Sequence, residues 1–299
     1  MAKTFKNTKT PEQRKAEAAD LHAKIAAGVE SLTDSEQWEK YLTWCRSFHA
    51  YSVNNILLVM AQMPEASRIA GFRSWQTRGR SVKRGEKGIR ILGYAKKKIQ
   101  EEQDNGETEE RYVEYFPPLS VFDISQTEII DEDKANAGVI AHRLEGEDAD
   151  GIADAVESWL TDEGWTVTTE TIGGETIGGE TNGMTSPELR KVIISDKLSP
   201  AQRAKTMIHE AAHVVLHADQ DLREYVEHRG QKETEAESVA YVVAGMFGLD
   251  TSSYTIGYIA GWAQGDTEII RSTAANVLKA SHIIYEALTE TAEQVEAAA

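Results

Sequence analysis

The sequence predicts an α+β fold in two domains, one of mixed helices and β-hairpins and one of helices packed on a small sheet. The length of 299 residues suits two domains of ordinary size. Residues 1–100 carry 19 Lys/Arg and 9 Asp/Glu, whereas residues 101–299 carry 13 and 40. In the second half the predicted elements follow the order helix, strand, strand, helix, helix, which is typical of α+β domains. We therefore expect a first domain at 1–125, an acidic linker at 126–150 and a second domain at 151–299.

The first half is expected to open with two helices. An amphipathic, alanine-rich pattern predicts a helix over residues 11–30, and a second helix is predicted from the cap Thr33-Asp34 to Gln62. Aromatic residues recur in the second helix at helical spacing, which favours a buried face over a base-stacking surface. They are Trp38, Tyr41, Trp44, Phe48 and Tyr51.

Short strands are expected next, after the helix breaker Met63-Pro64. Strand-like runs cover residues 90–94, 111–116 and 120–124. The polar, acidic stretch 101–110 between the first two is predicted to be a solvent-facing hairpin connection.

The second half is predicted to begin with a helix over 148–161 and a strand over 165–169. A short Thr-Ile-Gly-Gly-Glu repeat at 171–180 reads as a loop between that strand and another at 191–195. Three helices should follow, over 199–217, 232–247 and 266–290. Ser199 as the N-cap with Pro200 at the first helical position is a favoured helix start.

Composition excludes several classes of protein. Hydrophobic residues make up 40% and charged residues 27%, which is typical of globular proteins. The apolar runs are far shorter than the roughly 20 residues that span a bilayer, and the N-terminus has no apolar signal region. The single cysteine, Cys45, excludes an intrachain disulfide framework and a Cys-based metal site. A cytoplasmic protein with no membrane partner is expected.

A dense basic segment lies within this acidic chain. Residues 68–98 contain eleven Lys/Arg and one acid, Glu86. Such a block favours a surface for a polyanion, the alternative being an ordinary solvated face.

The motif that points most directly to chemistry is His209-Glu210-x-x-His213. Residues four apart lie about 40° apart around a helix, so both imidazoles can reach one metal ion. About 0.02 occurrences are expected by chance from this composition. Apolar neighbours on every side indicate a buried helix, in which such polar groups need partners. The alternative is a pair of histidines that are only hydrogen-bonded in the core.

A catalytic zinc site needs a third protein ligand. His217 continues the i+4 series but lies about 12 Å along the helix from His209, so a structural role is expected. The next predicted helix offers carboxylates around residues 233–237. Glu235 and Glu237 point about 200° apart, so only one can face the metal, and periodicity leaves both open.

The pattern His209-Glu-x-x-His213 followed by Glu235-Ala-Glu-Ser-Val-Ala240 resembles that of ImmA/IrrE-type zinc peptidases. The resemblance implies that His209, His213 and Glu235 bind Zn²⁺, with Mn²⁺ or another divalent metal as alternatives, and that Glu210 is the catalytic general base. The strand 191–195 is expected to pair with an extended peptide by edge addition. Candidate oxyanion stabilisers are Tyr225, His228, Tyr254 and Tyr258.

Further segments resemble ArdC-like antirestriction proteins over about residues 36–285. They are Phe48-His-Ala-Tyr51-Ser52-Val-Asn54-Asn55, Ala70-Gly-Phe-Arg-Ser-Trp75, Arg84-Gly-Glu-Lys-Gly-Ile-Arg-Ile91, Val121-Phe-Asp-Ile-Ser-Gln126 and Tyr254-Thr-Ile-Gly-Tyr-Ile-Ala-Gly-Trp262. The resemblance implies a single-stranded-DNA-binding domain fused to a zinc metallopeptidase domain, carried by plasmids or phages to protect incoming DNA from restriction. A host restriction or regulatory protein is the expected peptidase substrate.

Single-strand binders combine a positive groove with aromatic rings on which bases stack. The expected DNA-binding residues are Arg73, Trp75, Arg78, Arg80, Lys83, Arg84, Lys87 and Arg90. Trp75 is equally well read as a core residue. Gly79, Gly85 and Gly88 would let backbone amides approach phosphates.

Two other functions remain open from the sequence. One is a single-strand DNA shield whose metal site is only structural. The other is an acidic DNA mimic that inhibits restriction enzymes, based on the net charge of −27 over residues 101–299.

Overall fold

The computed structural model describes residues 10–102, 108–136, 149–172, 175–176, 179–180, 182–219, 228–249, 251, 263 and 266–298. The chain divides into two compact units. The first comprises residues 1–28 and 54–139, and the second comprises 29–53 and 140–299. These boundaries differ from the predicted 1–125, 126–150 and 151–299. Residues 29–53 belong to the second unit, and the first part of the predicted linker, up to residue 139, belongs to the first.

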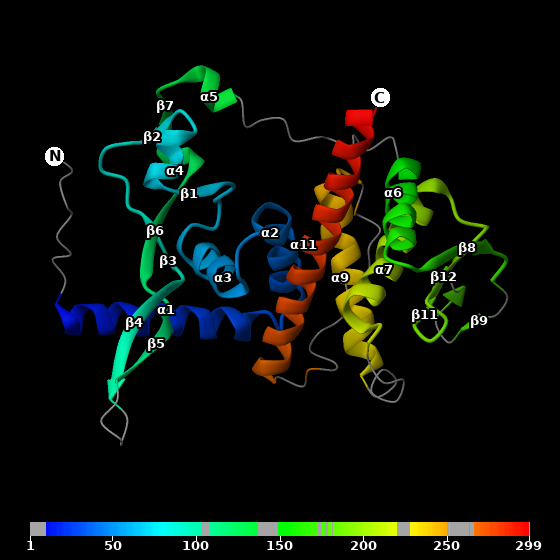
Figure 1. The fold of residues 1–299 in the computed structure, drawn as a ribbon, viewed down its shortest axis with the longest axis horizontal. Coiled ribbons are helices and arrows are strands. Elements are labelled where there is room, and N and C mark those ends of the chain that lie inside the picture. Colours follow the sequence, from blue (N-terminus) through cyan, green and yellow to red (C-terminus); the bar gives the residue numbers. More distant parts are fainter. Residues whose placement is uncertain are drawn as a thin grey trace. The chain divides into compact units, whose positions relative to one another are not determined.

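The first unit combines helices with small antiparallel sheets (Figure 1). A three-stranded sheet has the order β1-β6-β3, β2 pairs with β7, and β4 pairs with β5 as a separate two-stranded ribbon. The strands are β1 (Ile69–Gly71), β2 (Arg80–Val82), β3 (Ile89–Leu92), β4 (Ala95–Glu102), β5 (Thr108–Tyr115), β6 (Pro118–Asp123) and β7 (Thr127–Ile129). The helices are α1 (Pro11–Ser31), α3 (Val53–Gln62), α4 (Phe72–Thr77), the 3-10 turn η1 (Ile124–Gln126) and α5 (Glu132–Asn136).

The second unit packs helices on a three-stranded sheet of order β11-β12-β8. Its helices are α2 (Ser35–Phe48), α6 (Ala149–Asp162), α7 (Pro200–His217), α9 (Arg229–Met246) and α11 (Thr267–Ala298). Its strands are β8 (Thr166–Glu170), β11 (Gly183–Ser186) and β12 (Lys191–Ser195), with a small pair formed by β9 (Glu175–Thr176) and β10 (Gly179–Glu180). The predicted α+β class is confirmed.

The strand β12 is central in its sheet. It pairs antiparallel with β11 on one side and parallel with β8 on the other. The expectation that residues 191–195 offer an edge to a peptide is therefore wrong, because both edges of β12 are occupied. The strand β11 is the outer neighbour among the described residues.

The single helix predicted over 33–62 is two helices. Asp34 caps α2 as expected, its carboxylate accepting from the N–H groups of Glu36 and Gln37. The helix ends at Phe48 and α3 begins at Val53. The prediction of one helix was wrong because the two parts belong to different units, with α2 in the second and α3 in the first.

The predicted aromatic face of α2 lies in the core of the second unit. Trp38, Tyr41 and Phe48 are buried, whereas Trp44 and Tyr51 are half-buried. The indole of Trp38 lies 3.2 Å from the Ser238 hydroxyl, to which it donates, and the Tyr41 hydroxyl donates to the carbonyl of Ala274 at 2.9 Å. In the described part of the chain, no helix has both the length and the apolar character that crossing a membrane requires.

Candidate metal centre and basic surface

The helix α7 carries the motif into the interior of the second unit. Its predicted start is confirmed, because Ser199 is the N-cap and forms a capping box with Gln202, with Pro200 at the start of the helix. Met207, Ile208 and the alanines around them are fully buried against neighbouring elements. This packing fixes the helix rotation and therefore the direction of its histidines.

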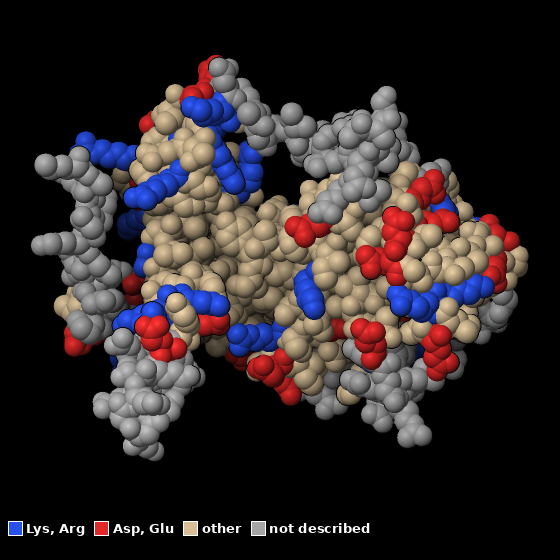
Figure 2. All heavy atoms as spheres, viewed as in Figure 1, with Lys and Arg blue, Asp and Glu red and all other residues tan. Residues whose placement is uncertain are grey.

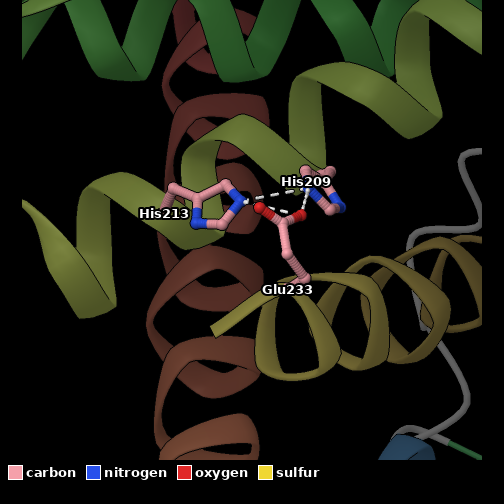
Figure 3. Close-up of side chains that lie close together, drawn as sticks. All are labelled: His209, His213 and Glu233. Carbon is pink, nitrogen blue, oxygen red and sulfur yellow. Dashed lines mark hydrogen bonds and ion pairs between the residues drawn. The ribbon is translucent and has the colours of Figure 1, made fainter. Parts of the chain in front are cut away.

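Three side chains from α7 and α9 converge on one point (Figure 3). The Nε2 atoms of His209 and His213 lie 3.1 Å apart. The Oε2 atom of Glu233, the fifth residue of α9, lies 3.5 Å from His209 Nε2 and 3.8 Å from His213 Nε2. Among the described residues these three form the group whose ligand atoms lie within 4.8 Å of one another.

The donor set fits a divalent cation. Two imidazole nitrogens at about 2.0–2.1 Å from a tetrahedral zinc ion lie about 3.3 Å apart, close to the separation of the two Nε2 atoms here. Two histidines and one carboxylate are a ligand combination found in catalytic zinc sites. The residues present could therefore hold such an ion.

A second carboxylate supports His209 from its other ring nitrogen. Glu237 Oε2 lies 3.3 Å from His209 Nδ1, and Lys205 Nζ lies 2.8 Å from Glu237 Oε1. Burial lowers the pKa of His209, but hydrogen bonds to Glu233 and Glu237 outweigh it and raise the pKa to about 10. The pKa of Glu233 falls well below its usual range; burial opposes that shift, and the two histidines outweigh it.

The structure does not bring Glu235 into this group. Its carboxylate is buried on another side of α9 and accepts from Gln231 Nε2 at 3.1 Å and Asn276 Nδ2 at 3.0 Å. Its Oε2 atom lies 3.5 Å from Nε2 of the buried His217. Burial raises the pKa of Glu235. Burial, with His213 and Lys232 nearby, lowers the pKa of His217 to about 4.

The sequence held a signal for Glu233 that the comparison of Glu235 with Glu237 missed. Residues 233 and 237 are four apart and share one face of α9, whereas residue 235 points about 200° away. The structure uses that shared face: both outer carboxylates contact His209.

Glu210 faces β11. Its Oε2 atom accepts from the Thr185 hydroxyl at 2.6 Å, and the side chain is 5% exposed. A Cβ atom on Gly183 would lie 2.7 Å from Glu210 Oε1, so the strand backbone approaches the carboxylate closely. Of the expected oxyanion stabilisers, Tyr225, Tyr254 and Tyr258 lie outside the described residues, and His228 is exposed just before α9.

Three of the expected DNA-binding residues are buried or half-buried and are held by contacts within the first unit. Trp75 is 3% exposed and donates from Nε1 to the Phe122 carbonyl, so its ring is part of the core and presents no stacking face. Arg90 Nε lies 2.6 Å from Glu17 Oε1, and Arg80 Nε donates to the Thr127 hydroxyl. Trp75 is therefore withdrawn as a base-stacking residue.

The remaining five cations are exposed. Figure 2 shows Lys and Arg gathered over the α4 and β2 end of the first unit. The five exposed cations are Arg73, Arg78, Lys83, Arg84 and Lys87. A turn closes from Lys83 to Glu86, and Gly85, with φ +94° and open space around it, allows that turn. Gly79 and Gly88 are instead required by packing, because a Cβ atom there would clash with residues 131 and 120, respectively.

Two family models match successive parts of the chain. Residues 12–122 match the family model for the N-terminal domain of anti-restriction factor ArdC. Residues 163–254 match that for the IrrE N-terminal-like domain of M78 peptidases. This is an ArdC-like protein of two domains.

The ArdC-like chain is also similar to individual proteins. It is 26% identical over 294 residues to an uncharacterized protein of Bacillus anthracis, covering 87% of this chain and 49% of the relative. The chain thus spans about half the length of that curated relative. The crystal structure of antirestriction ArdC from the R388 plasmid in metal-free form shares the fold, with TM-score 0.50, 19% identity, and coverage of 80% of this chain and 86% of that one. Its Mn(II)-bound form gives TM-score 0.47 and 18% identity, over 83% and 97% of the two chains.

Proposed function

We propose that the IrrE-like unit is a metal-dependent peptidase, with His209, His213 and Glu233 as the protein ligands of a divalent cation. The observation that carries this proposal is the convergence of their three ligand atoms, in a helix where Glu210 follows His209 directly. Zinc is the default ion for this ligand set, and Mn²⁺ is the alternative. The ion would supply Lewis-acid chemistry by polarising a scissile carbonyl and lowering the pKa of a water molecule.

The residues around the site have separate roles in this proposal. Glu210 accepts a proton from the attacking water and delivers it to the leaving amine. The Thr185 hydroxyl holds the Glu210 carboxylate in place. The strand β11, rather than β12, would pair with an extended peptide substrate, because it is the outer strand beside Glu210. Glu237 orients His209 through its Nδ1 atom.

For the first unit we propose single-stranded DNA binding. Its five exposed cations provide a surface for phosphates, and similarity to the ArdC N-terminal domain supports the assignment. Together the two activities suit an antirestriction protein of a plasmid or phage, with a host restriction or regulatory protein as the substrate.

The glutamine variant of the general base tests the peptidase proposal. Wild-type protein and Glu210→Gln would be expressed in restricting cells, and new protein N-termini would be compared by mass spectrometry. We expect Glu210→Gln to retain metal and DNA binding but to lose both the new N-termini and the protection of incoming DNA. The exposed Glu188→Gln is the matched control.

Equal protection by wild type and Glu210→Gln, with no new N-termini, would contradict the peptidase proposal and favour a DNA shield. Protection that survives removal of the metal and loss of DNA binding would favour the acidic mimic instead.

A further inference from the structure

The exposed aromatic side chains of the described residues all lie in the first unit. Four of the five belong to the β4–β5 ribbon or lie directly at its ends, with exposed fractions of 47–64%. They are Tyr94, Tyr112, Tyr115 and Phe116, and the fifth is Phe72 in α4. Because Trp75 is buried, a single-strand surface in this unit must take its stacking rings from elsewhere, and these residues provide them.

The ribbon interleaves these rings with lysines. Tyr94 and Phe116 flank its base, with ring centroids 5.9 Å apart, and Lys96 Nζ lies 5.7 Å from the centre of the Tyr94 ring. Tyr112 is the cross-strand partner of Lys98, and Tyr115 is the partner of Ala95. Successive side chains of a strand alternate between its two faces, and Tyr112 and Tyr115 are three residues apart in β5. Rings therefore occur on both faces of the ribbon.

Of the ribbon cations whose side chains the structure describes, Lys97 is the one best placed to meet a phosphate. Lys96 and Lys98 are held in cross-strand ion pairs with Glu114 and Glu110. Lys97 is exposed, lies opposite Val113, and makes no ion pair among the residues that the structure describes. Among the ribbon side chains that the structure describes, one cation without an ion pair thus lies beside four rings. This ratio indicates a surface that binds mainly by stacking and only secondarily by charge.

We propose that the ribbon formed by β4 and β5 is the base-stacking surface for single-stranded DNA. Unpaired bases offer their faces to rings, which bases inside a duplex do not. Aromatic rings that are exposed to water add little to the stability of an isolated two-stranded ribbon. Exposed apolar groups of this kind are typical of a binding surface, and stacked bases would cover them. The inference rests on the proposed DNA function. It assigns base stacking to the ribbon and leaves phosphate binding to the exposed cations at the α4 and β2 end.

Binding of a labelled oligo-dT to the full-length protein, measured by fluorescence anisotropy across salt concentrations, tests this assignment. The variants are Tyr112→Ala with Tyr115→Ala, Tyr94→Ala with Phe116→Ala, and Lys97→Gln. Ile129→Ala with Ile130→Ala removes exposed apolar side chains elsewhere in the same unit and is the control. Circular dichroism and thermal unfolding verify that each variant folds.

Each aromatic variant should bind roughly 5- to 100-fold more weakly for each stacking ring removed, with the salt dependence unchanged. Lys97→Gln should reduce the slope of log affinity against log salt by about 0.7, as expected for one single-strand phosphate contact. The control should bind as wild type does. Replacing dT with an abasic strand should weaken wild-type binding and erase the difference between wild type and the aromatic variants.

Two failures are distinguishable in this experiment. Wild-type protein that binds no oligonucleotide contradicts the proposed DNA function itself. If wild type binds DNA and every folded ribbon variant binds it equally well, only the ribbon assignment is overturned. The same follows if the ribbon variants lose binding to a protein partner but still bind DNA.

Discussion

His49 and His282 form a contact in the second unit that makes its stability depend on pH. Their Nδ1 atoms lie 3.0 Å apart, so one ring must donate to the other. Burial lowers the pKa of His49, and the charge of His282 lowers it further, while Glu286 on the same helix as His282 acts in the opposite direction. Folded protein therefore binds fewer protons at this site than unfolded protein does.

The sign of the effect follows from that difference. The pKa of a histidine in the unfolded chain is about 6.5, and that of His49 in the folded protein is lower. As the pH falls from one value toward the other, the unfolded chain takes up the proton first, so the free energy of unfolding decreases. We expect the urea midpoint of wild type to fall between pH 7.5 and 5.5 more steeply than that of His49→Gln. The exposed His22→Gln is the control, and equal slopes in wild type and His49→Gln would contradict this account.

Single residues also show where sequence reasoning ends. The spacing of His209, Glu210 and His213 placed all three on α7 beside one another, since helix geometry is local. The choice among three glutamates of α9 depends on how that helix is rotated against α7, which only packing decides. For the same reason the sequence could not decide whether Trp75 is buried or stacks on bases. A tryptophan among arginines has the same sequence pattern whether its helix directs the ring into the core or toward solvent.

At the scale of elements, β11 and α7 touch at Gly183. A Cβ atom there would lie 2.7 Å from both Glu210 Oε1 and Thr206 Cγ2, so Gly183→Ala must displace one of these side chains. Overpacking of this kind costs about 1–3 kcal/mol. We expect Gly183→Ala to lower the free energy of unfolding by that amount in urea titrations. Gly71→Ala, where no atom lies within 4 Å of the added carbon, serves as the comparison, and equal stability of the two variants would count against the close approach.

Elements with strong local signals were predicted well. The helices α1, α6, α7, α9 and α11 and the strands β3, β6, β8 and β12 all lie close to their expected ranges. The break between α2 and α3 and the order of strands in the second sheet were not predicted. Both depend on contacts between segments distant in sequence, which periodicity does not report.

At the scale of the whole molecule, the two units are interleaved in sequence. The chain passes between them near residues 28, 53 and 139, so α2 completes the second unit from the N-terminal half. Beyond its buried aromatic residues, α2 contributes Arg46, which lies 4.1 Å from the centre of the Tyr241 ring and donates to the Thr251 hydroxyl. The matched ArdC N-terminal model, residues 12–122, therefore includes a helix that packs in the IrrE-like unit.

A fragment of residues 140–299 should consequently fold poorly. It lacks Trp38 and Tyr41, and removing large buried aromatic side chains costs about 3–5 kcal/mol each. We expect it to melt well below the intact protein by circular dichroism and to recover stability when a peptide of residues 29–53 is added. A fragment that unfolds cooperatively at the temperature of the intact protein would show that α2 is dispensable.

We propose that three side chains of the second unit, His209, His213 and Glu233, hold a divalent metal. The most direct measurement is a calorimetric Zn²⁺ titration of metal-free wild type, Glu233→Gln and Glu235→Gln, with metal content verified by mass spectrometry. We expect about one ion per chain in wild type and in Glu235→Gln, and affinity at least 10-fold weaker in Glu233→Gln. Loss of binding in Glu235→Gln, with Glu233→Gln unchanged, would contradict this ligand assignment and restore the one that the sequence resemblance implied.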